Sequence, residues 1–187
     1  MIPPTPPRAP RRSVLLRILA TLVAAAPLAA CGPTPVPTPT PTAAFASEEE
    51  AFAAAEETYR EFTRRLNEID LADPRTFEPL FELSSGEFES ADRKAYSSMH
   101  AEGFAINGTT KILSFEGTAA DLRRNVVEAA VCLDVSDVTV VDSAGASQVD
   151  PNRPNTYALD VIFISDGRSL TIDSASVDQE KTCTLDG

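Results

Sequence analysis

The sequence has no tryptophan and a single histidine, His100, and its three cysteines lie far apart at Cys31, Cys132 and Cys183. Structural zinc is held mainly by clustered Cys and His side chains, and redox-active cysteine pairs are typically spaced Cys-x-x-Cys. Uninterrupted apolar runs of about 20 residues, which a membrane-spanning helix requires, are also missing. We therefore expect no metal centre, no bound cofactor and no membrane-spanning helix.

Acidic side chains outnumber basic ones, 28 Asp and Glu against 16 Lys and Arg, which gives a formal net charge of −12. Residues 1–30 contain four arginines and no acid, so the chain without them carries −16. A surface of that sign repels phosphate backbones and anionic lipid headgroups. The charge therefore argues against nucleic acid as a partner and against direct electrostatic docking to a membrane.

Residues 1–30 are organised like a secretory signal peptide, because basic positions up to Arg17 precede about 13 mostly apolar residues. The apolar region of a signal peptide needs only ~7–15 residues. It ends in Leu28-Ala29-Ala30-Cys31, which resembles the signal of bacterial lipoproteins. The resemblance implies cleavage between Ala30 and Cys31, diacylglycerol on the Cys31 sulfur and a fatty acyl group such as palmitate on the freed amine. The alternative is ordinary secretory cleavage beside a chance cysteine.

Residues 31–46 form a linker in which proline alternates with Thr or Val from Pro33 to Thr42. Proline fixes its own φ and pushes the preceding residue toward extended conformations, so the run predicts polyproline II. Ten residues at ~3.1 Å each make a stiff spacer on the order of 30 Å. Such a spacer would hold a folded domain clear of the lipid headgroups.

Residues 47–187 have the pattern of one globular domain that begins with a long helix. Ser47 and Glu50 have the spacing of a capping box, which predicts the start of the helix. The helix should end before Pro74, because proline disfavours helical conformation at the preceding residue. Apolar residues recur at spacings of three and four, which places them on one buried stripe of this helix. The stripe consists of Phe52, Ala55, Tyr59, Phe62, Leu66 and Ile69.

Two further helices are expected before the pattern changes. A short one should span residues 76–83 and be capped by Thr76, and a longer one should begin at Ser84, which forms a second capping box with Glu87. Gly103 should end the longer helix in a left-handed conformation. Its predicted apolar face consists of Phe88, Ala91, Ala95 and Met99.

After Gly103 the apolar period shortens to about two, which is typical of strands. We expect strands over residues 110–117, 125–142 with a bend near Ser136, 156–165 and 168–178. Asp166-Gly167 between the last two predicts a hairpin with a type I′ turn. Helices first and adjacent strands afterwards predict an α+β fold, with the helices packed on a curved antiparallel sheet of four or more strands.

This order of helices and strands resembles the NTF2-like, or cystatin-like, superfamily. The leader, the stalk, the segments AAEETYREF and VCLDVSDVTVVDSAG and the late Cys183 are similar to surface lipoproteins of Gram-positive bacteria that carry such a domain. The resemblance implies a cone of one long helix and a sheet whose interior can form a pocket. It also implies that dimers through the outer sheet face occur, although we expect a monomer.

Cys132 and Cys183 remain as a pair once Cys31 is assigned to the lipid. Thiols outside the cytoplasm oxidise, so we expect a disulfide between them. Closing a loop of roughly 50 residues would stabilise the domain by about 4 kcal/mol in the chain-entropy model.

Candidates for chemistry are few. Tyr59 and Tyr157 are possible pocket residues of the cone, and Asp160 is a possible acid beside them. Tyr157 and Asp160 are three positions apart, so on a regular strand they should face opposite sides. His100 falls in the last turn of the third predicted helix, where it suits the helix dipole.

Three aspartates lie around and after the bend region, but their spacing does not match a calcium-binding loop. We expect them to be ordinary strand-edge acids rather than metal ligands. They are Asp134, Asp137 and Asp142.

These features predict a lipid-anchored protein at the outer, extracytoplasmic face of the cell membrane, held there through Cys31. Its domain should work by noncovalent binding, either of an envelope protein or of a small ligand. The alternative is an isomerase- or hydrolase-like enzyme that uses the interior of the cone. No residue pattern identifies a reaction, so no catalytic residue is assigned.

Overall fold

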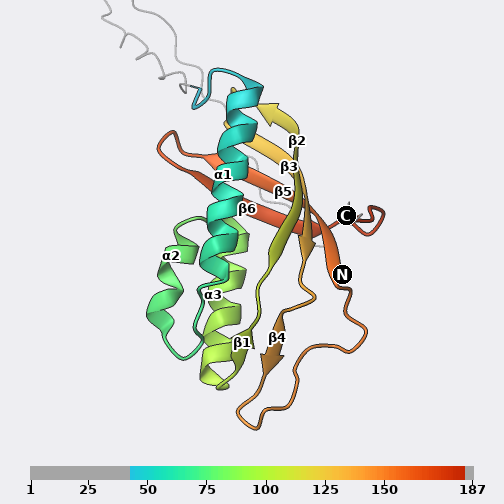
Figure 1. Ribbon diagram of the computed structural model, residues 1–187. Coiled ribbons are helices and arrows are strands. Elements are labelled where there is room, and N and C mark those ends of the chain that lie inside the picture. Colours follow the sequence, from blue (N-terminus) through green and yellow to red (C-terminus); the bar gives the residue numbers. More distant parts are fainter. Residues whose placement is uncertain (1–42, 184–187) are drawn as a thin grey trace, which may run out of the picture. The chain divides into compact units, whose positions relative to one another are not determined.

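The computed structural model describes residues 43–183. The predicted signal peptide, the lipidation and cleavage site at Ala30 and Cys31, and the linker up to residue 42 lie outside the described residues. Helices come first and strands afterwards (Figure 1). The elements are α1 (Glu48–Leu66), the 3-10 helix η1 (Pro74–Thr76), α2 (Glu78–Phe81), α3 (Gly86–Ala101), β1 (Ala105–Asn107), β2 (Lys111–Asp121), β3 (Val126–Asp134), β4 (Thr139–Val141), β5 (Thr156–Ser165) and β6 (Leu170–Val177).

Four strands form an antiparallel sheet in the order β2-β3-β5-β6, and β1 pairs with β4 in a separate two-stranded sheet. Helix α1 lies across one face of the larger sheet, and α2 and α3 lie beside the C-terminal half of α1 (Figure 1). The predicted α+β fold, with helices packed on a four-stranded antiparallel sheet, is therefore confirmed. This is the arrangement that the NTF2-like resemblance implied.

Helix α1 begins as predicted. The Ser47 hydroxyl accepts a hydrogen bond from the Glu50 N–H (3.2 Å), and the Glu50 carboxylate accepts one from the Ala46 N–H (2.8 Å). The reciprocal bond of the capping box thus reaches one residue upstream of the N-cap. Glu48 and Glu49 join Glu50 in the first turn, where negative charge favours the positive end of the helix dipole.

The core lies between the inner side of α1 and the inner face of the sheet. The ring centroid of Tyr59 lies 6.2–6.3 Å from those of Phe62, Phe115 and Phe163. Tyr59 is 4% exposed and Phe163 fully buried. Aromatic pairs at this spacing contribute about 0.5–1.5 kcal/mol each beyond the area they bury, so the cluster holds α1 on the sheet.

Helix α3 buries only part of the predicted apolar face, since Phe88 and Met99 pack partly buried against the core. Ala91 and Ala95 are exposed, and Tyr96 is buried instead. The Tyr96 ring packs 5.7 Å from the ring of Phe77 and 6.1 Å from that of Phe81. A tyrosine ring buries more apolar area than two methyl groups, so it determines which face turns inward.

The ends of the shorter helices were predicted in part. Gly103 (φ +72°) ends α3 as expected, since the Phe104 N–H bonds the Met99 carbonyl and the Gly103 N–H bonds the His100 carbonyl in a Schellman motif. Helix α3 starts after Ser85 rather than Ser84, and the Ser85 hydroxyl bonds side chains of β6 instead of capping the helix.

The cap predicted at Thr76 is wrong, because α2 has no side-chain cap. The Thr76 hydroxyl instead closes the preceding turn by donating to the Asp73 carbonyl (2.8 Å).

The predicted strand over 125–142 is two strands. It breaks after Asp134, whose carboxylate accepts from the Ser136 N–H (2.8 Å), and β4 resumes in the other sheet. The Asp166-Gly167 hairpin is confirmed, but the type I′ turn is wrong. Gly167 has positive φ and Asp166 does not, because the Asp166 carboxylate accepts from two N–H groups of the loop between β5 and β6.

Gly117 on β2 is required by close contact with α1. A Cβ atom at this position would lie 2.3 Å from the Cγ atom of Phe52. We expect Gly117→Ala to lower the free energy of unfolding by about 1–3 kcal/mol, as overpacking does. Urea unfolding monitored by circular dichroism measures this change.

The double variant Gly117→Ala/Phe52→Ala separates this contact from an effect on the strand itself. Removing the ring should relieve the clash, so the double variant should lose less stability than the two single variants together. Strict additivity of the two losses would show that the contact is not the cause.

Candidate functional site

A groove of about 440 Å³ lies between α1 and the loop that joins β5 to β6. Its apolar floor is formed by Phe45, Ala54, Leu83 and Leu170. Polar side chains from both walls surround the floor. They are Glu57, Thr58 and Glu61 on α1, and Ser165, Arg168 and Ser169 at the hairpin.

Local structure explains why these residues meet. Ala54, Glu57, Thr58 and Glu61 follow the spacing of one helix face, i, i+3, i+4 and i+7. Leu83 is held beside β6, because the Leu83 carbonyl accepts from the Ile172 N–H (2.9 Å). The groove is thus built from a helix face, a backbone-anchored segment and a hairpin that are distant in the sequence.

The start of the described chain borders the groove. The Ala44 N–H donates to the Asn125 Oδ1 atom (2.9 Å), and Phe45, the next residue, lines the groove floor. Asn125 has φ +56° in the loop between β2 and β3, a conformation that asparagine tolerates better than most residues. The chain therefore enters the domain beside the groove.

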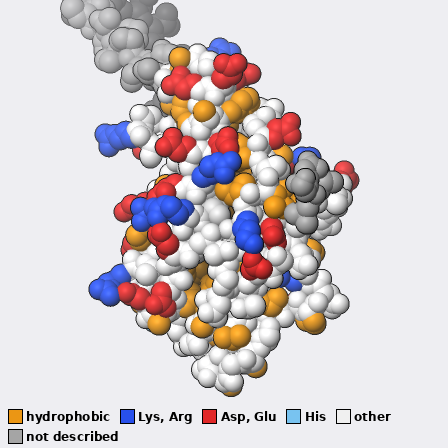
Figure 2. All heavy atoms as spheres, in the orientation of Figure 1, with side chains coloured by type: hydrophobic (Ala, Val, Ile, Leu, Met, Phe, Trp, Pro, Cys, Tyr) orange, Lys and Arg blue, Asp and Glu red, His pale blue; other side chains and the backbone are white. Residues whose placement is uncertain are grey.

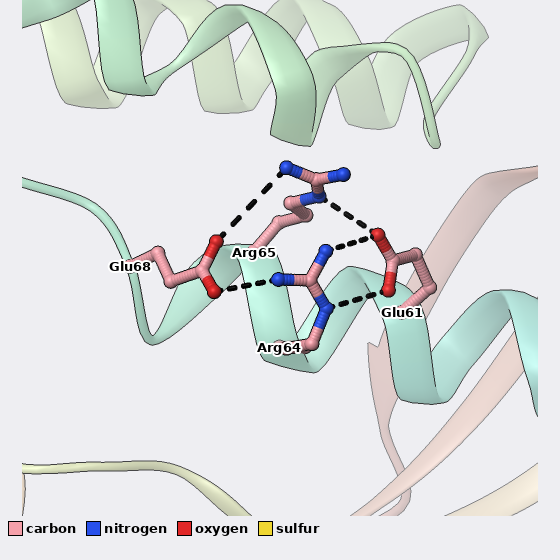
Figure 3. Close-up of polar contacts among 4 residues, drawn as sticks. All are labelled: Glu61, Arg64, Arg65 and Glu68. Carbon is pink, nitrogen blue, oxygen red and sulfur yellow. Dashed lines mark hydrogen bonds and ion pairs between the residues drawn. The ribbon is translucent and has the colours of Figure 1, made fainter.

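Four charged side chains at the C-terminal end of α1 and just beyond it neutralise one another (Figure 3). Glu61 accepts hydrogen bonds from both Arg64 and Arg65, and Glu68 pairs with the same two arginines. The bonds from Arg64 and then Arg65 lower the pKa of Glu61 to about 2. Glu61 lines the groove, but its charge is already balanced.

Two charged side chains of the groove, Glu57 and Arg168, lack such ion pairs among the described residues. Neither Glu57 nor Arg168 forms an ion pair or a side-chain hydrogen bond with any residue between 43 and 183. Both side chains are exposed. In Figure 2 acidic side chains also gather where α1 begins, in agreement with the three glutamates of its first turn. Within residues 43–183, the groove therefore holds one carboxylate and one guanidinium that form no ion pair.

Two smaller hollows lie elsewhere. One of about 390 Å³ lies on the outer face of the sheet, between Glu116 on β2 and the C-terminal residues Lys181 and Thr182. The other, of about 200 Å³, lies at the end of α1 and is bounded by Tyr96 and Ile106 among others.

The disulfide predicted between Cys132 and Cys183 is confirmed, with Cα atoms 5.6 Å apart. The segment that leads to it follows β6. The Asp178 N–H donates to the Ala158 carbonyl (2.9 Å), and Lys181 forms an ion pair with Asp160 (3.2 Å). The disulfide therefore fastens the C-terminal segment against the sheet face opposite the helices.

The structure does not group the two tyrosines that the sequence nominated for a pocket. Tyr59 is a core residue among aromatic rings, and burial raises the pKa of its hydroxyl. Tyr157 is half-buried on β5, on the same side of the strand as the buried Val161 and Phe163, whereas Asp160 is exposed. Neither tyrosine lines any of the three hollows.

The remaining nominated residues have structural partners. His100 lies in the last turn of α3, with its Nδ1 atom 2.6 Å from the Leu71 carbonyl oxygen. Asp137 pairs with Lys111, and Asp142 accepts backbone N–H groups of its own loop. Between residues 43 and 183 no group of three or more His, Cys, Asp or Glu side chains could hold a metal ion. Within the same range, none of the helices is both long and apolar enough to cross a membrane.

No protein-family model matches the chain, and no curated protein is significantly similar to it. Solved structures give distant likenesses. The intermembrane space region of the chloroplast protein ARC6 is 15% identical, with a TM-score of 0.47 over 67% of this chain and 95% of that chain. Aln2 from a Streptomyces species is 14% identical, with a TM-score of 0.43 over 70% and 91%. TraH from the Gram-positive conjugative plasmid pIP501 is 10% identical, with a TM-score of 0.45 over 68% and 93%. At TM-scores below 0.5 these likenesses assign no function to this chain.

Asp92 was not anticipated from the sequence. It lies on α3 one turn before Tyr96, and its Oδ2 atom is buried without a hydrogen-bond partner among the described residues. Burial raises the pKa of this carboxyl from 3.8 to about 6. The folded state therefore holds this proton more tightly than the unfolded chain, so the contribution of Asp92 to stability is fully present below pH ~4 and is lost as the pH rises through about 6.

We expect Asp92→Asn to raise the free energy of unfolding at pH 7.5 and to change it little at pH 4. The raised pKa corresponds to about 3 kcal/mol, which solvent screening of a partly exposed group reduces to about 1–2 kcal/mol. Urea unfolding at the two pH values measures the difference. Glu87→Gln, an exposed change on the same helix, is the control, and an equal gain from Asp92→Asn at both pH values would refute the assignment.

Proposed function

We propose that this protein is a lipoprotein anchored through Cys31 to the outer face of the cell membrane, whose domain acts by noncovalent binding at the groove. The Leu28-Ala29-Ala30-Cys31 signal and the alternating proline run up to Thr42 support the anchor and the stalk. The disulfide between Cys132 and Cys183 supports the location, because disulfides persist in oxidising compartments outside the cytoplasm.

One observation favours binding over catalysis. The space between α1 and the sheet, where an enzyme of this architecture would hold its substrate, is filled by the rings of Tyr59, Phe62, Phe115 and Phe163. The groove lies instead at the surface and is lined by apolar and charged side chains. Apolar hollows with a few polar groups are typical of ligand sites. The isomerase- or hydrolase-like alternative finds no comparable support.

The anchor predicts a change of location. Cys31→Ser removes the thiol that would receive the lipid, so the protein should pass from the membrane fraction to the soluble or secreted fraction. Immunoblots of fractionated cells measure the distribution, and intact mass reports the lipid. Thr34→Ser in the linker is the matched control. Membrane retention of the Cys31→Ser protein would reject the anchor.

The binding function predicts that filling the groove abolishes capture of a ligand. Ala54 is half-buried in the groove floor, so Ala54→Trp should fill the groove without entering the core. We expect envelope material retained by the immobilised wild-type protein to be lost from Ala54→Trp and kept by Ala95→Trp, which places the same ring on the exposed side of α3. Mass spectrometry of the retained material gives the comparison. Equal retention by both variants would exclude the groove as the binding surface.

A further inference from the structure

The groove presents opposite charges from its two walls. Glu57 projects from α1 and Arg168 from the loop between β5 and β6, and each is unpaired within the part of the chain that the structure describes. Since they form no ion pair, their charged groups are more than 4.0 Å apart. A ligand that satisfies both must itself carry two charges of opposite sign.

The acidic side chains next to Glu57 and Arg168 do not remove the need for a ligand with two opposite charges. Glu61, one turn along α1 from Glu57, is engaged by Arg64 and Arg65. Asp166, two residues before Arg168, accepts the Ser169 and Arg168 N–H groups (3.0 and 2.8 Å), which lower the pKa of its carboxyl and hold it in the loop. The positive charge of Arg168 lowers this pKa further, but the two side chains form no ion pair. A purely anionic ligand would face Glu57, and a purely cationic one would face Arg168.

The floor between the two charges is apolar. It is formed by Phe45, Ala54, Leu83 and Leu170, and the hollow of about 440 Å³ falls within the range of about 300–1,000 Å³ that small-molecule sites occupy. Two extended residues span about 7 Å, a length over which a chain can place an amine at one wall and a carboxylate at the other.

We propose that the groove binds a short apolar peptide with free termini. The terminal ammonium group would pair with Glu57, and the terminal carboxylate would receive two parallel hydrogen bonds from the Arg168 guanidinium. The apolar side chains would cover the floor. This inference rests on the proposed function only in taking the groove as the binding surface.

Isothermal titration with the dipeptide Leu-Leu tests the proposal. The full chain is used as it is isolated, in vesicles if it carries the lipid and in buffer if it does not, so the result does not depend on the anchor. We expect binding with a dissociation constant of about 1 mM or below. Glu57→Gln and Arg168→Gln should each weaken it by up to about fivefold, as loss of a solvent-exposed ion pair does. Glu49→Gln, which removes the same charge from α1 outside the groove, should leave binding unchanged.

Modified peptides assign each charge to its partner. N-acetyl-Leu-Leu lacks the ammonium group, so Glu57→Gln should no longer weaken its binding, and Leu-Leu-amide should be insensitive to Arg168→Gln in the same way. Failure of Leu-Leu to bind the wild type, or equal effects of Glu57→Gln on both peptides, would overturn the proposal. If Leu-Leu fails while Ala54→Trp still loses envelope material, this inference is wrong and the binding function stands.

Discussion

The packing of the aromatic face of α1 against the inner face of the sheet is the interaction on which the domain depends. Tyr59 and Phe62 from the helix meet Phe115 on β2 and Phe163 on β5 in one cluster. Neither element could bury these rings alone, because an isolated helix or sheet exposes its apolar face. The contact is close enough that β2 carries a glycine, Gly117, where the Phe52 ring crosses it.

This packing also determines where a ligand can bind. Because rings fill the interior, the remaining hollows lie at the edges of the helix–sheet contact and on the outer face of the sheet. The groove lies where the outward-turned side of α1 meets the hairpin between β5 and β6. Glu57 and Arg168 are exposed, so they keep their charges without the cost of burial.

Both faces of the four-stranded sheet are packed against other parts of the chain. The helices cover one face, and on the other the disulfide between Cys132 and Cys183 holds the segment after β6 against β3 and β5. The Ala44–Asn125 bond adds a third attachment where the chain enters the domain. Beside the groove, the described chain is therefore held at Ala44 as well as along α1.

Predictions based on hydrophobic periodicity and on capping residues succeeded where local interactions determine the start, end or type of an element. Ser47 and Glu50 set the start of α1, Gly103 ended α3, and the period of two located β5. They failed where partners distant in sequence decide. On α3 the expected buried face included Ala91 and Ala95, which are exposed, whereas Tyr96 is buried beside Phe77 and Phe81.

The sequence by itself indicated helices followed by strands, a disulfide between the two late cysteines and a lipoprotein-like leader, since each follows from residue types and from patterns along the chain. Only the tertiary structure decided that the segment after Asp134 leaves the main sheet, that Asp92 is buried and that Glu57 faces the groove shared with Arg168. The groove depends on surfaces that meet across more than a hundred residues of chain, and no local pattern predicts that contact.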